Sequence, residues 1–313
     1  IGLIGVANSS EYWHLIFWTI PYGLGAGNID TALNNYVAKN LESRHMSWLH
    51  SCWGIGASTG PLIMAFFLAK GTFWQGAFYV VASIQSILLI IMFTSRPLWN
   101  KAESLQANLK SESDIISNKV AFKTAKVKHA MLSFFVYVAM EGIINVWAAS
   151  YLVEFYGLGA EFAARMVSLF FFSLTFGRIF DGFLSLKMNS INRLRMGQAI
   201  GLIGILLLIA SSQTIFVSLS FILMGFGFAT QYPTMMHETP HRFGENYSAA
   251  VISLQISSAY LGFIVMSLSS GAWISVFGLS FLPYFMLSMM LILIYTTQSI
   301  QSHITKKAAK LLD

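Results

Sequence analysis

Residues 131–153 read MLSFFVYVAMEGIINVWAASYLV, and the single charged side chain in this stretch is Glu141. A helix needs about 20 mainly apolar residues to cross the hydrocarbon core of a bilayer, so this stretch is long enough to span one. The whole chain has the same character, because 56% of its residues are hydrophobic and 10% are charged. A soluble domain carries about 25% charged residues. The composition therefore predicts a polytopic, all-α membrane protein.

Similar apolar runs, separated by short polar segments, recur along the chain. They predict nine membrane spans, at residues 12–38, 46–69, 75–95, 128–153, 163–185, 196–212, 215–236, 247–270 and 279–298. Residues 1–7 are also apolar but are too short to cross a bilayer. We expect this stub to be the end of a helix whose beginning is missing.

Basic residues concentrate in alternate polar segments. The richer set contains Lys39, Arg44, the segment 96–128, Lys187, Arg193, Arg195, Arg242, Lys306, Lys307 and Lys310. The other set contains only Lys70 and Arg165. Lysine and arginine favour the cytoplasmic side of a membrane protein, so we expect the C-terminal tail to be cytoplasmic. The net charge of +6 is then an orientation signal and does not indicate nucleic-acid binding.

Residues 96–127 form the one long polar segment between predicted spans, and we interpret them as a cytoplasmic linker in which a short amphipathic helix can form. The predicted organisation is the remainder of an N-terminal six-helix bundle at 1–95, the linker at 96–127, a C-terminal six-helix bundle at 128–300 and a tail at 301–313. Many transporters are built from such repeats. We therefore expect about nine of twelve spans, plus the stub, to be present.

Ionisable groups inside a span cost about 2.5–3.5 kcal/mol on insertion scales, so each needs an explanation. Asp30 lies in the stretch GLGAGNIDTALNN at residues 23–35, with Asn34 one helical turn away. Glu141 has Asn145 one turn away and Trp147 nearby. We interpret Asp30 as the proton-coupling group and Glu141 as a substrate ligand. The alternative for each is a buried acid whose hydrogen bonds are purely structural.

Other polar side chains inside the spans complete a candidate midplane binding site. A hydroxylated solute would be bound by amides, carboxylates and an aromatic face. The candidate substrate-binding residues are Asn34, Asn35, His50, Glu141, Asn145, Trp147, Gln231 and Gln255. Pro233 also predicts a break in the helix just after Gln231.

His237, Glu238 and His241 have a spacing that suggests a metal site at first sight. Pro240 interrupts the series, and we interpret the segment as a solvated cytoplasmic loop. The single cysteine, Cys52, excludes a cysteine-based zinc cluster. We therefore predict neither a metal nor a cofactor.

The stretch FGRIFDG at residues 176–182 resembles the Gly-Arg-x-x-Asp-Gly loop repeat of the major facilitator superfamily. This resemblance implies a gating role for Gly177, Arg178, Asp181 and Gly182. Arg178 and Asp181 are three residues apart at a helix end. We expect them to pair with each other or with a neighbouring helix terminus, forming a latch that holds one access state. WGIGASTGP at 53–61 is similar to the Gly-Pro motif of the superfamily's fifth helix.

The stretch at 23–35 resembles the fourth helix of the fucose–galactose–glucose:proton symporters, whose acid at this point is linked to proton coupling and maps onto Asp30. The resemblance implies proton-coupled uptake of a sugar or similar small polar solute by alternating access. We expect a monomer in the cell membrane, and not an enzyme. A proton-driven exporter of drugs or metabolites is the alternative, favoured by 15 Met and 26 Phe residues. A multipass membrane enzyme is a remote one.

Overall fold

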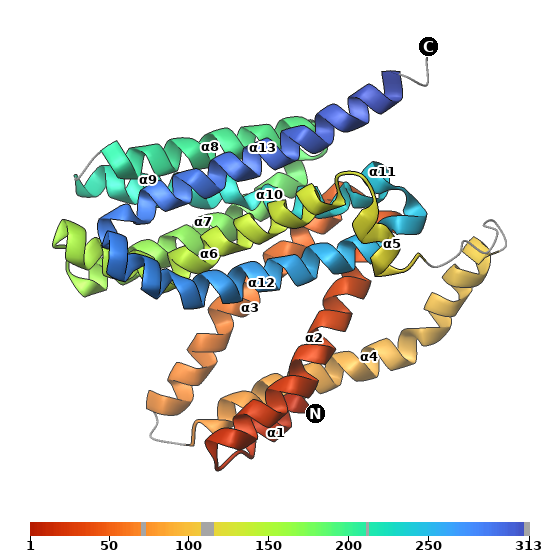
Figure 1. The fold of residues 1–313 in the computed structure, drawn as a ribbon. Coiled ribbons are helices and arrows are strands. Elements are labelled where there is room, and N and C mark those ends of the chain that lie inside the picture. The colour runs from red at the N-terminus through yellow and green to blue at the C-terminus, as the bar shows by residue number, and fades with distance from the viewer. Residues whose placement is uncertain (70–72, 108–115, 211–212, 310–313) are drawn as a thin grey trace. The chain divides into compact units, whose positions relative to one another are not determined.

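The computed structural model describes residues 1–69, 73–107, 116–210 and 213–309, and the regular secondary structure in these ranges is helical (Figure 1). The helices are α1 (Gly2–Ala7), α2 (Tyr12–Asn40), α3 (Ser43–Ala69), α4 (Gln75–Ala107), α5 (Asn118–Lys123), α6 (Val127–Tyr156), α7 (Ala160–Leu184), α8 (Ser190–Ala210), α9 (Thr214–Ala229), α10 (Gln231–His237), α11 (Thr239–Phe243), α12 (Glu245–Phe277), the 3₁₀ helix η1 (Leu279–Phe281) and α13 (Leu282–Ala309). The predicted all-α fold is confirmed.

Seven helical segments among the described residues are long and apolar enough to cross a membrane. They are Gln75–Pro97, Val127–Tyr156, Ala160–Leu184, Ser190–Ala210, Thr214–His237, Glu245–Phe277 and Leu279–Lys307. The two remaining predicted spans, 12–38 and 46–69, lie on the long helices α2 and α3, which are not among these seven. The predicted break near Pro233 is also present, because α9 ends at Ala229 and α10 begins at Gln231.

The polar segment predicted as a linker is partly helical. Helix α4 continues past the predicted end of its span at residue 95 and ends at Ala107, and α5 lies within the segment. Residues 108–115 are outside the described part of the chain. The amphipathic helix expected here thus has a short counterpart in α5.

The chain divides into two compact units. The first contains residues 1–32 and 55–115, and the second contains residues 33–54 and 116–313. Helices α2 and α3 therefore contribute to both units, and the segment 33–54 that joins them packs with the later helices. These two units, which are defined by contacts, do not coincide with the predicted bundles. The predicted bundle boundaries at residues 95 and 128 stay a prediction.

In the first unit, α1 packs against α4, and the hydroxyl of Tyr79 donates a hydrogen bond of 2.9 Å to Asn8 Oδ1. Gly5 lies so close to the ring of Trp18 that an added Cβ would be 2.0 Å from the indole. This glycine is what permits the stub helix to approach α2. The stub is thus a packed helix of one and a half turns.

In the second unit, α6 packs against α12 and α13, and α9 packs against α7 and α8 (Figure 1). The centre is filled by aromatic side chains at most 1% exposed, namely Phe134, Tyr137, Phe170, Phe221 and Phe228. Between α8 and α9 the backbones themselves touch, because a Cβ added to Gly227 would lie 2.2 Å from the backbone nitrogen of Gly201. Small residues permit this close packing.

Candidate functional site

Two buried charges of the Gly177–Gly182 motif lie on α7, and each binds neighbouring helices. Arg178 is 3% exposed and Asp181 is 1% exposed. Among the described contacts they are not paired with each other. Arg178 binds a glutamate of α6 and Asp181 binds an arginine of α8. We expected them to pair with each other or with a neighbouring helix terminus; they instead form two separate ion pairs, and Asp181 also contacts the start of α3.

The first ion pair joins Arg178 to Glu141, with 3.2 Å between Nη2 and Oε1. The same Nη2 donates to the hydroxyl of Tyr137 at 3.2 Å, and Tyr137 in turn donates a short hydrogen bond to Glu141. Nη1 donates to the backbone oxygen of His50 on α3 at 3.2 Å. The guanidinium also lies over the ring of Trp53, 5.5 Å from its centroid. Arg178 thus connects α3, α6 and α7.

Histidine His50 extends this cluster towards α2 and α10. One ring nitrogen, Nε2, lies 3.0 Å from Oδ1 of Asn34, which is 1% exposed. The imidazole also meets the ring of Tyr232 edge to face, with 4.8 Å between centroids. We call Asn34, His50, Tyr137, Glu141 and Arg178 the central cluster. Three of the predicted site residues, Asn34, His50 and Glu141, therefore lie together around an arginine that sequence reasoning had assigned only to gating.

The central cluster is a buried charged network with one accessible side. The side chain of Arg178 is 4% exposed, whereas that of Glu141 is 13% exposed and the indole residue Trp53 is 53% exposed. Taking a charge out of water is costly unless a partner compensates it, so Arg178 and Glu141 depend on each other. A partly accessible carboxylate beside an exposed indole has the chemistry to bind a hydroxylated solute. The substrate role of Glu141 stays a prediction.

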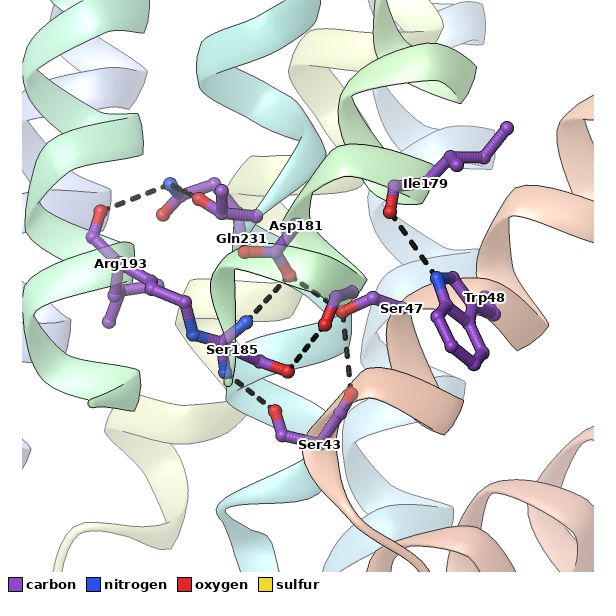
Figure 2. A network of polar contacts seen from close by, with 11 residues as sticks. Ser43, Ser47, Trp48, Ile179, Asp181, Ser185, Arg193 and Gln231 are labelled. Atoms are coloured by element: carbon purple, nitrogen blue, oxygen red, sulfur yellow. Dashed lines mark hydrogen bonds and ion pairs between the residues drawn. The ribbon is translucent and has the colours of Figure 1, made fainter. Parts of the chain in front are cut away.

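The second ion pair joins Asp181 to Arg193, with 2.7 Å between Oδ2 and Nη1 (Figure 2). The same carboxylate oxygen accepts a hydrogen bond of 2.6 Å from the hydroxyl of Ser47, and Nη2 of Arg193 donates to the hydroxyl of Ser43 at 2.6 Å. Both serines begin α3. We call Ser43, Ser47, Asp181 and Arg193 the latch, because they join the start of α3 to the α7–α8 connection.

Close packing beside the latch depends on a glycine of the motif. A Cβ added to Gly182 would lie 2.1 Å from Nε1 of Trp48, which donates to the backbone oxygen of Ile179 at 3.3 Å (Figure 2). Gly177 is similarly close to Ala229, with 2.6 Å for an added Cβ. The two motif glycines therefore admit α3 on one side and α9 on the other.

Sequence reasoning missed Ser43, Ser47 and Trp48, and treated Arg193 only as an orientation charge. A signal was present in the spacing of the serines. Ser43 and Ser47 are four residues apart, so they share one face of α3. Nothing in the sequence indicated that Arg193 and Asp181 would face that helix.

The other predicted binding residues have local partners instead. Asn35 accepts a hydrogen bond of 2.9 Å from Ser248, and Gln255 accepts one of 3.0 Å from Thr239. Gln231 is fully buried and donates to the backbone oxygen of Leu194 at 3.2 Å. Three of the predicted substrate ligands thus contribute to packing between helices in the second unit.

Three further predicted residues lie apart from the central cluster. Trp147 donates a hydrogen bond of 2.6 Å to Ser270, and Asn145 is exposed. Asp30 is partly exposed and belongs to the first unit, whereas Asn34, one turn further along α2, belongs to the second. The polar face of α2 is therefore divided between the two units.

The histidine segment differs from the solvated loop that we expected. Residues 231–243 form α10 and α11, and His237 is only 8% exposed. Its Nε2 lies 3.0 Å from the backbone oxygen of Leu41, just beyond the end of α2. The expectation of solvation is wrong because His237 packs beneath this helix end. In the described ranges no group of three or more His, Cys, Asp or Glu residues could hold a metal ion.

Comparison with known proteins places this architecture in a family. The chain matches the Major Facilitator Superfamily over residues 1–267. The glucose/mannose transporter GlcP of Bacillus subtilis (strain 168) is 24% identical over 188 residues, which are 58% of this chain and 46% of GlcP. The chain therefore spans less than half the length of this curated relative.

Solved structures agree in fold. A bacterial homologue of the iron transporter ferroportin, in an outward-facing state, has a TM-score of 0.70 at 14% identity, covering 95% of this chain and 76% of that one. The Major Facilitator Superfamily transporter FucP, in the outward conformation, has a TM-score of 0.61 at 17% identity, covering 94% of this chain and 80% of that one. With its helical multi-pass fold and a family match over residues 1–267, the chain belongs to the Major Facilitator Superfamily, a family of membrane transporters and not of enzymes.

Proposed function

We propose that this chain carries out proton-coupled uptake of a sugar or similar small polar solute by alternating access. The observation that carries the proposal is the latch. Its two serines belong to α3, and its ion pair joins the end of α7 to the start of α8. Such a contact can close one side of a transporter and release it. The distribution of basic residues favours a cytoplasmic position for this side of the protein and for the C-terminal tail. The proposed protein is a monomer of the cell membrane.

The latch has a strength that suits a reversible gate. The ion pair stays within the later helices when α3 moves away, so within the latch only the two serine hydrogen bonds must break. Outside the latch, Trp48 must leave the backbone of Ile179, and Arg178 must leave the backbone of His50. A hydrogen bond to a charged group contributes about 1.5–3 kcal/mol. Two of them contribute about 3–6 kcal/mol. Inverting a two-state equilibrium from 1:99 to 99:1 requires about 5.5 kcal/mol, so the two serine hydrogen bonds have the size that differential binding of solute and proton must offset in such a gate.

The central cluster supports a hydroxylated solute. It combines a carboxylate, a guanidinium, an amide and an imidazole, which together donate and accept hydrogen bonds. Trp53 offers an exposed indole face beside Arg178 for the C–H surface of a sugar ring. GlcP is named a glucose/mannose transporter, and a related FucP structure is described as a fucose:proton symporter. These names agree with a sugar as the solute.

Asp30 is the proposed proton carrier. Asp30 lies on α2 in the predicted span 12–38, and a charge inside a span is costly, so a carrier that has taken up a proton there reorients more easily. Proton and solute each change the affinity for the other by the same factor when both bind one cycling protein. Asp30 thus couples the two gradients.

This assignment is tested with Asp30→Asn in proteoliposomes. The variant imitates the neutral acid permanently, so we expect solute exchange to persist and accumulation driven by an imposed acid-outside gradient to be lost. Asn28→Ala, an exposed position on the same helix, is the control. If Asp30→Asn still concentrates solute, the acid has a structural role in helix packing.

One observation favours the second candidate, a proton-driven exporter of drugs or metabolites. A hollow in the second unit is lined mainly by apolar and aromatic side chains, among them Ile143, Trp147, Met266, Trp273 and Phe285. Such a wall suits an apolar ligand better than a sugar. Movement of hydrophobic dyes against their gradient, with no sugar uptake under the same conditions, would favour this candidate.

A further inference from the structure

Helix α5 lies at one end of the second unit, directly before the span formed by α6. Its Ala121 is buried and packs with Val127 of α6 and with Ala250 and Val251 of α12. Helix α6 has 30 residues, and a rise of about 1.5 Å for each gives about 45 Å, the thickness of a bilayer with its headgroup layers. The start of α6, and α5 beside it, therefore belong at the level of the lipid headgroups.

The chain around α5 is basic. Residues 116–130 contain four lysines and neither aspartate nor glutamate. The preceding acids, Glu112 and Asp114, lie outside the described residues, and the next acid of the packed helices, Glu245, is the first residue of α12. Within 116–130, therefore, no carboxylate neutralises the lysines. A surface of this sign attracts anionic groups.

Two of the four lysines make contacts within the fold. Lys126 donates a hydrogen bond of 2.8 Å from Nζ to the hydroxyl of Ser299 on α13. Lys128 is exposed, and its Nζ lies 5.0 Å from the centre of the Phe122 ring. An ammonium over an aromatic face is held there by a cation–π interaction, which leaves its outer side available to an anion.

The other two lysines point away from the fold. Lys119 and Lys123 are four residues apart on α5, so they share one face of this helix, and both are exposed. Neither makes an ion pair or a hydrogen bond with the described residues. Beside them, Val120 is 52% exposed and Phe122 is 41% exposed. Apolar side chains next to lysines are typical of a helix in the interface of an anionic membrane.

We propose that α5 binds the headgroups of anionic phospholipids through Lys119 and Lys123, with Lys128 as a further cation. The phosphate oxygens accept charged hydrogen bonds from the ammonium groups, and Val120 and Phe122 contact the upper part of the acyl chains. This contact anchors the polar segment before α6 to the membrane surface. The inference depends neither on the solute nor on the coupling ion proposed above.

The test measures which lipid lies beside α5 in the whole protein. A bimane fluorophore is attached to Ser117→Cys, at the exposed residue before α5, in a Cys52→Ser background. The protein is reconstituted into phosphatidylcholine vesicles that contain equal fractions of either brominated phosphatidylglycerol or brominated phosphatidylcholine, because bromine quenches a nearby bimane. We expect stronger quenching by phosphatidylglycerol. This preference should disappear in about 1 M sodium chloride, where the Debye length is about 3 Å.

Removal of the two outward lysines should remove most of the preference. A lysine near an anionic membrane surface contributes about fivefold to affinity, so Lys119→Gln with Lys123→Gln should lower the preference by up to about fivefold for each lysine. Lys306→Gln with Lys307→Gln is the matched control, since it removes the same charge from the exposed end of α13. Both double variants should keep the thermal midpoint of the labelled protein in neutral detergent, because all four side chains are exposed.

Three outcomes would overturn the proposal. Equal quenching by the two lipids in the labelled protein would leave these lysines to an acidic partner protein. A preference that survives Lys119→Gln with Lys123→Gln would show that other groups attract the lipid. Equal losses in the two double variants would show that the overall charge of this side of the protein, and not α5, attracts the lipid.

Discussion

Helix α7 carries two buried ion pairs that differ in how open they are. The carboxylate of Glu141, bound to Arg178, is 13% exposed, whereas that of Asp181, bound to Arg193, is 0% exposed. Aromatic rings and an exposed indole surround the first pair, and serine hydroxyls cover the second. Both are ion pairs between an arginine and a carboxylate, and they differ in how accessible the carboxylate is. An open pair can exchange partners with a solute, and a sealed pair can only hold a structure together or release it.

The sealed pair should give the largest effect. Asp181→Ala leaves Arg193 buried without a counter-charge, which costs about 3–5 kcal/mol. We expect a large drop in the thermal midpoint of the purified protein. Replacing both partners, Asp181→Ala with Arg193→Met, should recover much of the loss because no isolated charge remains. Equal stability of the single variant and the wild type would contradict the idea that this pair is sealed from water.

The open pair should show its effect in binding. Glu141→Gln removes the charge that compensates Arg178, but water reaches this site more easily, so the loss of stability should be smaller than for Asp181→Ala. We expect solute affinity to fall by about 10- to 100-fold, the equivalent of one charged hydrogen bond. Equilibrium binding of a labelled sugar in detergent measures this. Unchanged affinity with reduced stability would assign Glu141 to structure alone.

The hydroxyls that cover the sealed pair should have an intermediate effect. Ser47→Ala removes one bond to Asp181, worth about 1.5 kcal/mol, which corresponds to about tenfold in the opening equilibrium. Opening is followed by thiol labelling of Ser51→Cys, a position that is 4% exposed and one turn from Ser47, in a Cys52→Ser background. Ser83→Ala, on the exposed face of α4, is the control. A labelling rate that Ser47→Ala does not raise would remove Ser47 from the gate.

A hydrogen bond between two neutral side chains elsewhere in the second unit should contribute least to stability. Ser248→Ala removes the hydrogen bond to Asn35, in which neither side chain is charged. Such a bond contributes about 0.5–1.5 kcal/mol. We expect the smallest change in the thermal midpoint of the variants considered. A loss as large as that of Asp181→Ala would show that charge is not what distinguishes the latch.

The spans were predictable because the thickness of the bilayer fixes the length of an apolar run. Seven predicted spans coincide with the seven segments long and apolar enough to cross a membrane, the other two lie on α2 and α3, and the span at 215–236 is divided between α9 and α10. The extension of α4 to Ala107 and the short helix α11 were not predicted. Their sequences are polar or contain proline, and they are helical because of where they pack. His237 illustrates this, since only the end of α2 explains its burial.

The sequence indicated which residues belong to the candidate site better than it indicated which residues they contact. The motif at 176–182 identified two important charges, but it left their partner open between each other and a neighbouring helix terminus. Glu141 is 37 residues from Arg178, and Ser47 is 134 residues from Asp181. Hydrophobic periodicity gives the face of a helix that is buried, but not the helix that covers it. Gln231 and Gln255 have side chains that could bind a solute. In the structure Gln231 donates to the backbone oxygen of Leu194, and Gln255 accepts from the hydroxyl of Thr239.

The glycine contact between α8 and α9 has a consequence for biosynthesis. These helices follow one another along the chain, and their backbones touch at Gly201 and Gly227 with no side chain between them. Helices in a membrane associate through such close packing once they have been inserted. The two form a hairpin whose contact surface is complete before α12 and α13 are synthesised. We expect it to be an early folding intermediate in the membrane, onto which the later helices assemble.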